Sequence, residues 1–168
     1  MDEIAGLAEH SLAKQYPCRV PVWWGRHGET ERDSSEIGVS GRLVTLRIYK
    51  NFKRFERLMA KVLRAPKELR RPLDRMNSTL WELCDGSRTF EKICTEMNHL
   101  FKEEIAPVIA RTAVALSLFQ QHNLLLILNE PLDGRWKVGP GVVPENQELS
   151  GLDDDSIYDT ELLNGEQM

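Results

Sequence analysis

Residues 73–93 read LDRMNSTLWELCDGSRTFEKI, and this run contains a helix, a stop signal and the start of a second helix. Asp74 is a candidate N-cap, because its carboxylate can accept a hydrogen bond from a free amide of the first helical turn. Apolar residues then recur at helical spacing: Met76, Leu80, Trp81, Leu83 and Cys84. Asp85-Gly86 ends this helix, since glycine adopts the left-handed conformation without steric cost, and Thr89 begins the next helix. The run therefore predicts a compact helix-turn-helix.

Several positions of this run occur together in one known family: Leu73-Asp74, Leu80-Trp81-Glu82-Leu83, Asp85-Gly86, Arg88-Thr89-Phe90 and Ile93. On these residues the chain resembles the PqqD-like family, the pyrroloquinoline quinone biosynthesis protein D type of domain. The similarity extends over residues 70–128. It implies an α+β fold of the winged helix-turn-helix type, with a small N-terminal antiparallel sheet followed by three helices.

The resemblance also implies a function. PqqD-like domains act as RiPP precursor peptide recognition elements, which bind the leader of a precursor peptide and present it to a modifying enzyme, such as a radical SAM enzyme. They do not catalyse the modification themselves. We therefore expect a non-catalytic peptide chaperone, without a cofactor, whose partners are a leader peptide and its modifying enzyme.

In this family the leader adds as a strand to an exposed sheet edge, and its groove lies between the third strand and the third helix. Carried onto this chain, the groove is expected at these peptide-binding residues: Leu69, Arg70, Arg71, Leu73, Val114, Leu118 and Gln121. Arg70 and Arg71 can pair with acidic residues of a leader.

The segments before this run predict a strand and an inserted helix. Residues 43–49 alternate in a strand pattern. Residues 51–65 combine apolar residues three or four apart with Lys and Arg, which predicts a basic amphipathic helix ended by Pro66. Typical PqqD-like domains join these strands by short turns, so this helix is an insert.

The segments after this run predict a helix and a hairpin. Residues 106–121 form a third helix that is apolar on most faces, and such a helix is expected to be central. Residues 124–128 indicate a buried strand. The turn chemistry of residues 131–134 suits a hairpin with residues 135–138, which would form the wing.

These patterns divide the chain into three parts. Residues 1–40 are an N-terminal extension, partly ordered, with a weak helical pattern at its start. Residues 41–140 are the domain that contains the insert. Residues 141–168 are an acidic tail that is expected to be disordered, because it has too few large apolar groups to offset the entropy of ordering. Within the tail, a short docking segment is an open alternative at Tyr158, Leu162 and Leu163.

Length and composition favour one domain in a reducing compartment. The 168 residues, 41% of them hydrophobic, can bury one ordinary core. The three cysteines form no C-x-x-C pair and no zinc-ligand spacing, so we expect reduced thiols and no metal. The longest apolar run, residues 124–128, is too short to cross a bilayer, and the acidic start Met1-Asp2-Glu3 is unlike a signal peptide. A cytoplasmic location is expected.

Charge is unevenly distributed and suggests two further functions. From Arg42 to Arg75 there are twelve Lys or Arg and three acids, which gives a local charge of +9. Winged-helix nucleic-acid binding is one alternative, because such a basic region attracts phosphate. Association with an anionic membrane surface through residues 51–65 is another, although the same apolar face would equally cover the sheet.

Two other patterns resemble enzymatic sites. Arg26-His27-Gly28-Glu29-Thr30 resembles the phosphohistidine motif of histidine phosphatases, but that chemistry needs the end of a buried parallel strand, and no βαβ alternation follows. Paired acids such as Glu103-Glu104 are more typical of a solvated helix face. No catalytic residue is therefore assigned.

The tryptophans indicate packing. Trp81 continues the apolar surface of its helix and is expected to anchor the core. Trp23 and Trp24 are adjacent in an extended segment and point to opposite faces, so we expect one to pack and the other to contact a partner.

Overall fold

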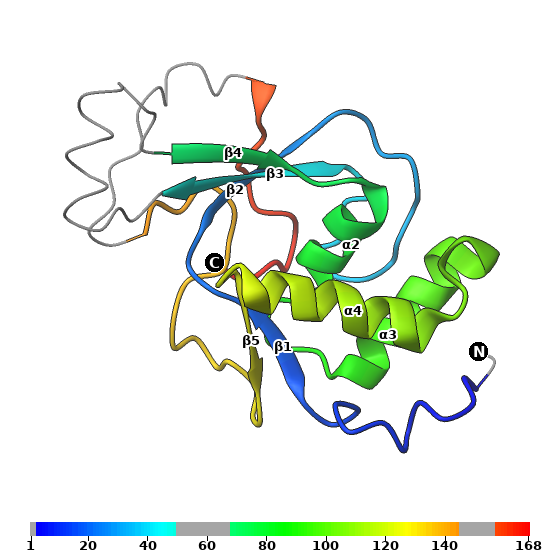
Figure 1. Ribbon diagram of the computed structural model, residues 1–168. Coiled ribbons are helices and arrows are strands. Elements are labelled where there is room, and N and C mark those ends of the chain that lie inside the picture. Colours follow the sequence, from blue (N-terminus) through cyan, green and yellow to red (C-terminus); the bar gives the residue numbers. More distant parts are fainter. Residues whose placement is uncertain (1–2, 50–67, 145–156) are drawn as a thin grey trace, which may run out of the picture.

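The computed structural model describes residues 3–49, 68–144 and 157–168. Within these ranges it is a mixed α+β structure with two small antiparallel sheets and three α-helices (Figure 1). The strands are β1 (Tyr16–Arg19), β2 (Trp23–His27), β3 (Leu43–Tyr49), β4 (Glu68–Pro72) and β5 (Leu125–Leu128). The helices are α2 (Arg75–Leu83), α3 (Phe90–Phe101) and α4 (Val108–Gln121), and a 3₁₀ helix spans Lys102–Ile105. The insert expected at residues 51–65 lies outside the described residues.

A three-stranded sheet in the order β2–β3–β4 lies at the top of Figure 1. The strand predicted at residues 43–49 is confirmed as β3, its central strand. The register pairs Leu46 of β3 with Trp24 of β2 and with Arg71 of β4. Val44 and Leu46 are fully buried in the main core. Because side chains alternate along a strand, this apolar pair fixes which face of the sheet covers the helices.

The two helices predicted within residues 73–93 are confirmed as α2 and α3, together with the caps and the glycine predicted for them. The Asp74 carboxylate accepts a hydrogen bond from the Asn77 amide at 2.8 Å and caps α2. Gly86 has a φ of +81°, and a Cβ there would lie 2.7 Å from Leu132 Cβ and 2.8 Å from Cys18 Sγ. Glycine is therefore required by both conformation and space. The Thr89 hydroxyl accepts a hydrogen bond from the Lys92 amide at 3.3 Å and caps α3.

One main hydrophobic core joins the three-stranded sheet, the helices and β5. Trp81 is fully buried and meets Phe119 of α4 edge-on at 5.6 Å between ring centroids, which confirms it as a core anchor. The prediction for Trp23 and Trp24 is wrong, because both are buried. The Trp24 indole donates a hydrogen bond to the Val138 carbonyl at 3.0 Å, and Trp23 packs against Tyr158 and Arg47.

The third predicted helix is confirmed as α4, but its expected central position is wrong. Leu116 and Phe119 face the core with exposed fractions of 1% and 3%. Val114 and Leu118, by contrast, are 60% and 48% exposed. The apolar residues therefore serve two faces of α4, and only one of these faces packs.

The predicted C-terminal hairpin is wrong. Asp133 and Gly134 have the positive φ values of a tight turn, +50° and +72°, but the described residues 135–138 form no strand. β5 instead pairs with β1 near the N-terminus, with Leu126 opposite Cys18. Only Leu125 of β5 is fully buried, so the strand predicted at residues 124–128 is less buried than expected.

The ends of the chain also differ from the prediction. The described residues 3–15 form successive turns, with backbone bonds such as Leu7 N to Ile4 O, and no α-helix. Strands β1 and β2 pair with β5 and β3, so strand pairing crosses the boundary expected at residue 40. Residues 157–168 of the tail contact the body, which corrects the disorder predicted for that part and agrees with the docking alternative at Tyr158. Residues 145–156 lie outside the described ranges.

Two further expectations concern the state of the three cysteines and the presence of a membrane-spanning helix. Cys18, Cys84 and Cys94 are buried free thiols, and burial raises the pKa of Cys18 to about 12. Of the helices in the described ranges, none has the length and apolar character needed to cross a bilayer.

The N-cap of α2 can be tested by a matched pair of substitutions. Asp74→Ala removes the acceptor and is expected to lower the free energy of unfolding by about 1 kcal/mol. Asp74→Asn keeps an acceptor oxygen and is expected to cost much less. Urea denaturation monitored by circular dichroism measures both. Equal losses in the two variants would contradict the capping role.

Candidate functional site

The strand β4 is the edge of the three-stranded sheet where the predicted peptide groove begins. Within the described residues, β4 pairs with β3 on one side, and no described strand pairs with its other side. The opposite edge, β2, is covered, because Arg26 and Asp159 exchange two backbone hydrogen bonds of 2.9 and 2.7 Å. Of the two edges, β4 is therefore the one at which strand addition can be considered.

One hydrogen bond shows which backbone N–H and C=O groups of β4 point toward β3 and which point away from it. The Leu73 amide donates to the Val44 carbonyl at 2.9 Å, just beyond the last paired residues. In an antiparallel pair the backbone groups of alternate residues point toward the partner strand. The backbone groups of Arg70 and Pro72 are therefore directed away from β3. Proline lacks an N–H and is tolerated at this position of an edge strand, so Pro72 fits the edge geometry.

On the helix-facing side of β4, the side chains become more exposed from Leu73 to Leu69. Leu73 is 8% exposed and belongs to the main core, so the structure places this predicted binding residue inside the core. Arg71, two residues earlier, is half-buried, and Leu69 is 47% exposed. Leu69 lies opposite Ile48 of β3, which packs on the core and is only partly buried. Apolar surface thus continues from the core to the edge of the sheet.

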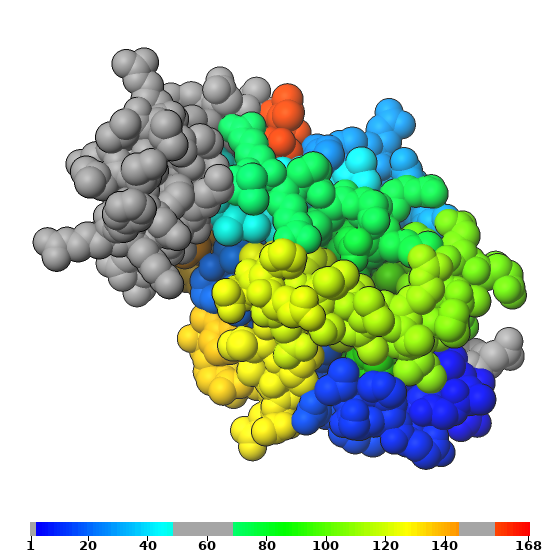
Figure 2. Space-filling view, in the orientation of Figure 1, coloured from blue at the N-terminus to red at the C-terminus, as the bar shows by residue number. Residues whose placement is uncertain are grey.

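The helix α4 carries the other predicted residues on its exposed face. Val114, Leu118 and Gln121 are four and three residues apart, so they lie on one face of the helix. All three are exposed, with Val114 at 60% and Leu118 at 48%. Figure 2 shows the surfaces of β4, in green, and of α4, in yellow, on the same side of the molecule. Large apolar side chains exposed on such a face are typical of an interaction surface.

Arg26, from the motif that resembles the histidine phosphatases, is part of a buried ion network. Its Nε lies 2.7 Å from a Glu82 carboxylate oxygen, and its Nη1 and Nη2 lie 3.0 and 2.6 Å from the two oxygens of Glu166. The Gly38 carbonyl accepts another bond at 3.1 Å. The guanidinium is fully buried and is saturated by groups of the chain itself.

The protonation behaviour of this network follows from burial and pairing. Burial alone would lower the pKa of Arg26, but the Glu166 and Glu82 carboxylates hold it above its ordinary value, so the guanidinium stays charged. Burial raises the pKa of Glu82, and this rise is opposed by Arg26 and by two hydrogen bonds from Ser40. The neighbouring His27 bonds Thr45 through Nε2 at 3.0 Å, and burial together with Arg42 lowers its pKa.

Sequence reasoning missed this network as a structural unit. Its signal was Glu82, a charged residue inside the apolar run LWELC, which requires a buried cation as its partner. The cation is Arg26 on β2, and the second carboxylate comes from the acidic tail.

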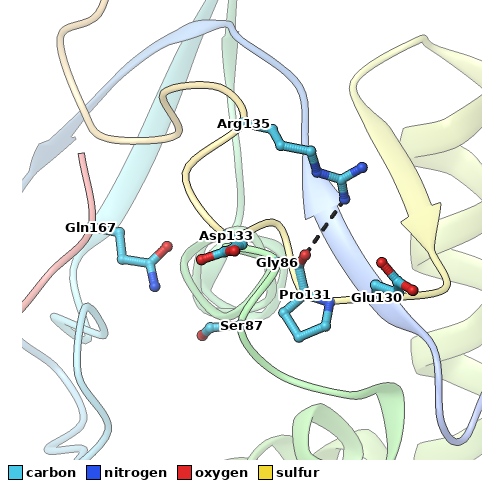
Figure 3. Close-up of a pocket in the computed structure, with 7 residues that line it drawn as sticks. All are labelled: Gly86, Ser87, Glu130, Pro131, Asp133, Arg135 and Gln167. Atoms are coloured by element: carbon cyan, nitrogen blue, oxygen red, sulfur yellow. Dashed lines mark hydrogen bonds between the residues drawn. The ribbon is translucent and has the colours of Figure 1, made fainter.

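A pocket of about 530 Å³ opens beside the turn between α2 and α3 (Figure 3). Five of its seven lining residues have polar or charged side chains; the lining consists of Gly86, Ser87, Glu130, Pro131, Asp133, Arg135 and Gln167. The Arg135 guanidinium donates to the carbonyls of Leu132 and Pro131, so it braces its own turn. None of the predicted peptide-binding residues lines this pocket. In the part of the chain that the structure describes, no group of His, Cys, Asp and Glu is arranged to hold a metal ion.

Comparison of the chain with family models, with curated proteins and with solved structures finds no match. The resemblance to the PqqD-like family therefore rests on the residues of the chain alone.

The exposed face of α4 predicts different stability effects for two leucines in the same helix. Leu116→Ala is expected to lower the free energy of unfolding by about 2–5 kcal/mol, because it leaves a cavity in the core. Leu118→Ala is expected to change it by less than about 0.5 kcal/mol, since this side chain is half exposed. Chemical denaturation distinguishes the two. A large loss for Leu118→Ala would mean that this face packs rather than remains available.

Proposed function

We propose that this chain is a PqqD-like winged helix-turn-helix domain that binds an extended precursor or leader peptide and presents it to a modifying enzyme. The observation that supports the proposal is that the described residues leave one edge of the three-stranded sheet, β4, without a further strand, while Val114 and Leu118 of α4 are exposed. Such a domain needs no catalytic residue, because the enzyme supplies the chemistry.

The peptide adds to β4 as a further strand. Its backbone pairs with the outward backbone groups of β4, which supply affinity without regard to sequence. Pro72 offers a carbonyl but no N–H, so pairing weakens toward that end of the strand. The peptide is therefore positioned mainly along residues 68–71.

The side chains of the peptide supply specificity. Alternate side chains of an added strand point toward the helix side of the sheet. There they meet Leu69 and the exposed apolar residues Val114 and Leu118, which accept apolar groups. Arg71 on the same side of β4 places a cation beside this apolar surface and favours a leader that also carries a carboxylate.

The other functions have weaker support. In a winged-helix protein that binds DNA, the second helix of the helix-turn-helix enters the major groove and needs exposed cations. In α3, Lys92 is instead paired with Glu36 and Glu96 at 3.1 Å each. The membrane alternative falls on residues 51–65, outside the described ranges.

The groove can be tested with short peptides encoded beside this gene. A leader is expected to shift the backbone amide signals within residues 69–73, where Pro72 has no amide proton, in a nuclear magnetic resonance titration. Leu118→Glu is expected to weaken its binding by about tenfold or more, because it places a charge where an apolar group binds.

Leu126→Glu is the matched control for this test. Leu126 of β5 is 48% exposed, the same fraction as Leu118, but it lies on the other sheet. Its substitution should leave leader binding unchanged. Equal effects of both substitutions, or amide shifts confined to β1 and β5, would contradict the proposal. Strongly salt-dependent binding to generic DNA would instead favour the nucleic-acid function.

A further inference from the structure

Residues 157–168, here called the C-terminal segment, are held on the body by contacts like those of a bound peptide. None of its residues belongs to a hydrophobic core cluster. Three of its apolar side chains are exposed, Ile157 by 66%, Leu162 by 43% and Met168 by 57%, and Leu163 is half-buried. The segment is therefore attached by backbone, aromatic and ionic contacts rather than by burial in the core.

The first part of the segment docks on β2. Asp159 forms a backbone bridge with Arg26, and the Tyr158 ring meets His27 and Trp23 edge-on at 5.5 and 5.8 Å. Gly25 makes room for this ring, because a Cβ there would lie 2.9 Å from Tyr158 Cβ. The body thus presents a backbone donor and a backbone acceptor at Arg26, and two aromatic rings that contact Tyr158.

The Asp159 carboxylate has its own partners. One oxygen lies 2.8 Å from Nη1 of Arg42, and the other accepts the Glu161 amide at 2.9 Å. The Glu161 amide and Arg42 lower the pKa of Asp159, so the docked form favours the ionised carboxylate.

The second part of the segment inserts Glu166 beside Arg26. Both oxygens of Glu166 are bound by this guanidinium, and the Glu166 side chain is 4% exposed. Arg26 is oriented without the segment's help, because Glu82 holds its Nε and its guanidinium lies 4.7 Å from the Trp24 ring centroid. Two donor groups are therefore aimed at the position of an incoming carboxylate.

The local charge balance favours that carboxylate. Arg19 is a second buried guanidinium, 4.8 Å from the Trp24 ring centroid, and its hydrogen bonds go to the carbonyls of Val138, Trp81 and Glu82. Its main acidic influences are Asp85, which is paired with Arg88, and Glu166. Without Glu166, Arg26 would keep one carboxylate partner and Arg19 would lose one of its acidic neighbours, so the site favours an anionic side chain at this position.

We propose that the surface around Arg26 is a carboxylate-accepting peptide site, distinct from the β4 edge, that holds the C-terminal segment and can accept the same segment from a second copy of this chain. Its ligand is an extended segment with Tyr-Asp followed, seven residues after the Asp, by Glu. Twelve residues, 145–156, separate the segment from the rest of the described chain, and a fully extended chain of that length reaches at most about 40 Å. Exchange of an identical element between copies is a common route to dimers. The proposal does not depend on peptide binding at β4.

Two full-length variants test the exchange. One, Tyr158→Ala with Glu166→Ala, keeps the site and loses its ligand. The other, Arg26→Gln with Glu82→Gln, keeps the ligand and loses the guanidinium that binds Glu166. Each alone is expected to be monomeric by light scattering, and their mixture is expected to contain a one-to-one complex. Adding Glu166→Gln to the second variant should abolish the complex. Folded variants that remain monomeric when mixed would overturn exchange between copies.

A second experiment avoids altering the buried charges. A protease site inserted within residues 145–156 of the otherwise unchanged chain allows the segment to be cut from the body. Fluorescent peptide 157–168 is then expected to replace the cut segment, and the same peptide with Glu166→Gln is expected to bind about tenfold more weakly or worse. If the cut segment never exchanges with the peptide while the body remains folded, it is an inseparable part of the fold and the proposal is wrong.

Discussion

The ion pair between Arg26 and Glu82 is a buried electrostatic link between β2 and α2, two elements that also share the main hydrophobic core. Both side chains are fully buried, and their closest atoms are 2.7 Å apart. Removing two charges from water is costly, so the pair is stable only where further groups satisfy it. Ser40, Gly38 and Glu166 do so, and each comes from a segment without regular structure. The pair thereby fixes β2, the loop after it, α2 and the end of the chain relative to one another.

The local features of the fold could be predicted from the sequence because their causes are local. Asp74 and Thr89 cap helices through amides three residues away, and Gly86 is set by its own φ and its immediate contacts. The partner of β5 could not be predicted in the same way. The turn at Asp133-Gly134 has the dihedral angles of a hairpin, yet β5 pairs with β1, more distant in sequence. The pairing of strands that are distant in sequence depends on how their side chains pack in the folded molecule. The residues of a turn do not predict this packing.

For the candidate site, the sequence predicted a strand and a helix at the positions of β4 and α4, and Leu69, Val114 and Leu118 are exposed on them. That these residues bind a peptide stays a prediction. Leu73 lies in the core instead of in the predicted groove. A strand pattern could not show this, because it does not tell where a strand passes beneath its helix. The apolar sequence of α4 was also ambiguous, since the same side chains suit a core and a binding face. The Arg26 network was missed because its members are far apart in the sequence.

The covered edge of β2 has a consequence for assembly. A sheet with two available edges can add strands at both, and identical molecules can then join into chains of unlimited length. In the three-stranded sheet the bridge between Arg26 and Asp159 occupies one edge. Through the strands that the structure describes, two identical molecules can then join only β4 to β4, which forms a closed pair rather than an unlimited chain. The C-terminal segment thus occupies the second edge that a fibre-like assembly would need.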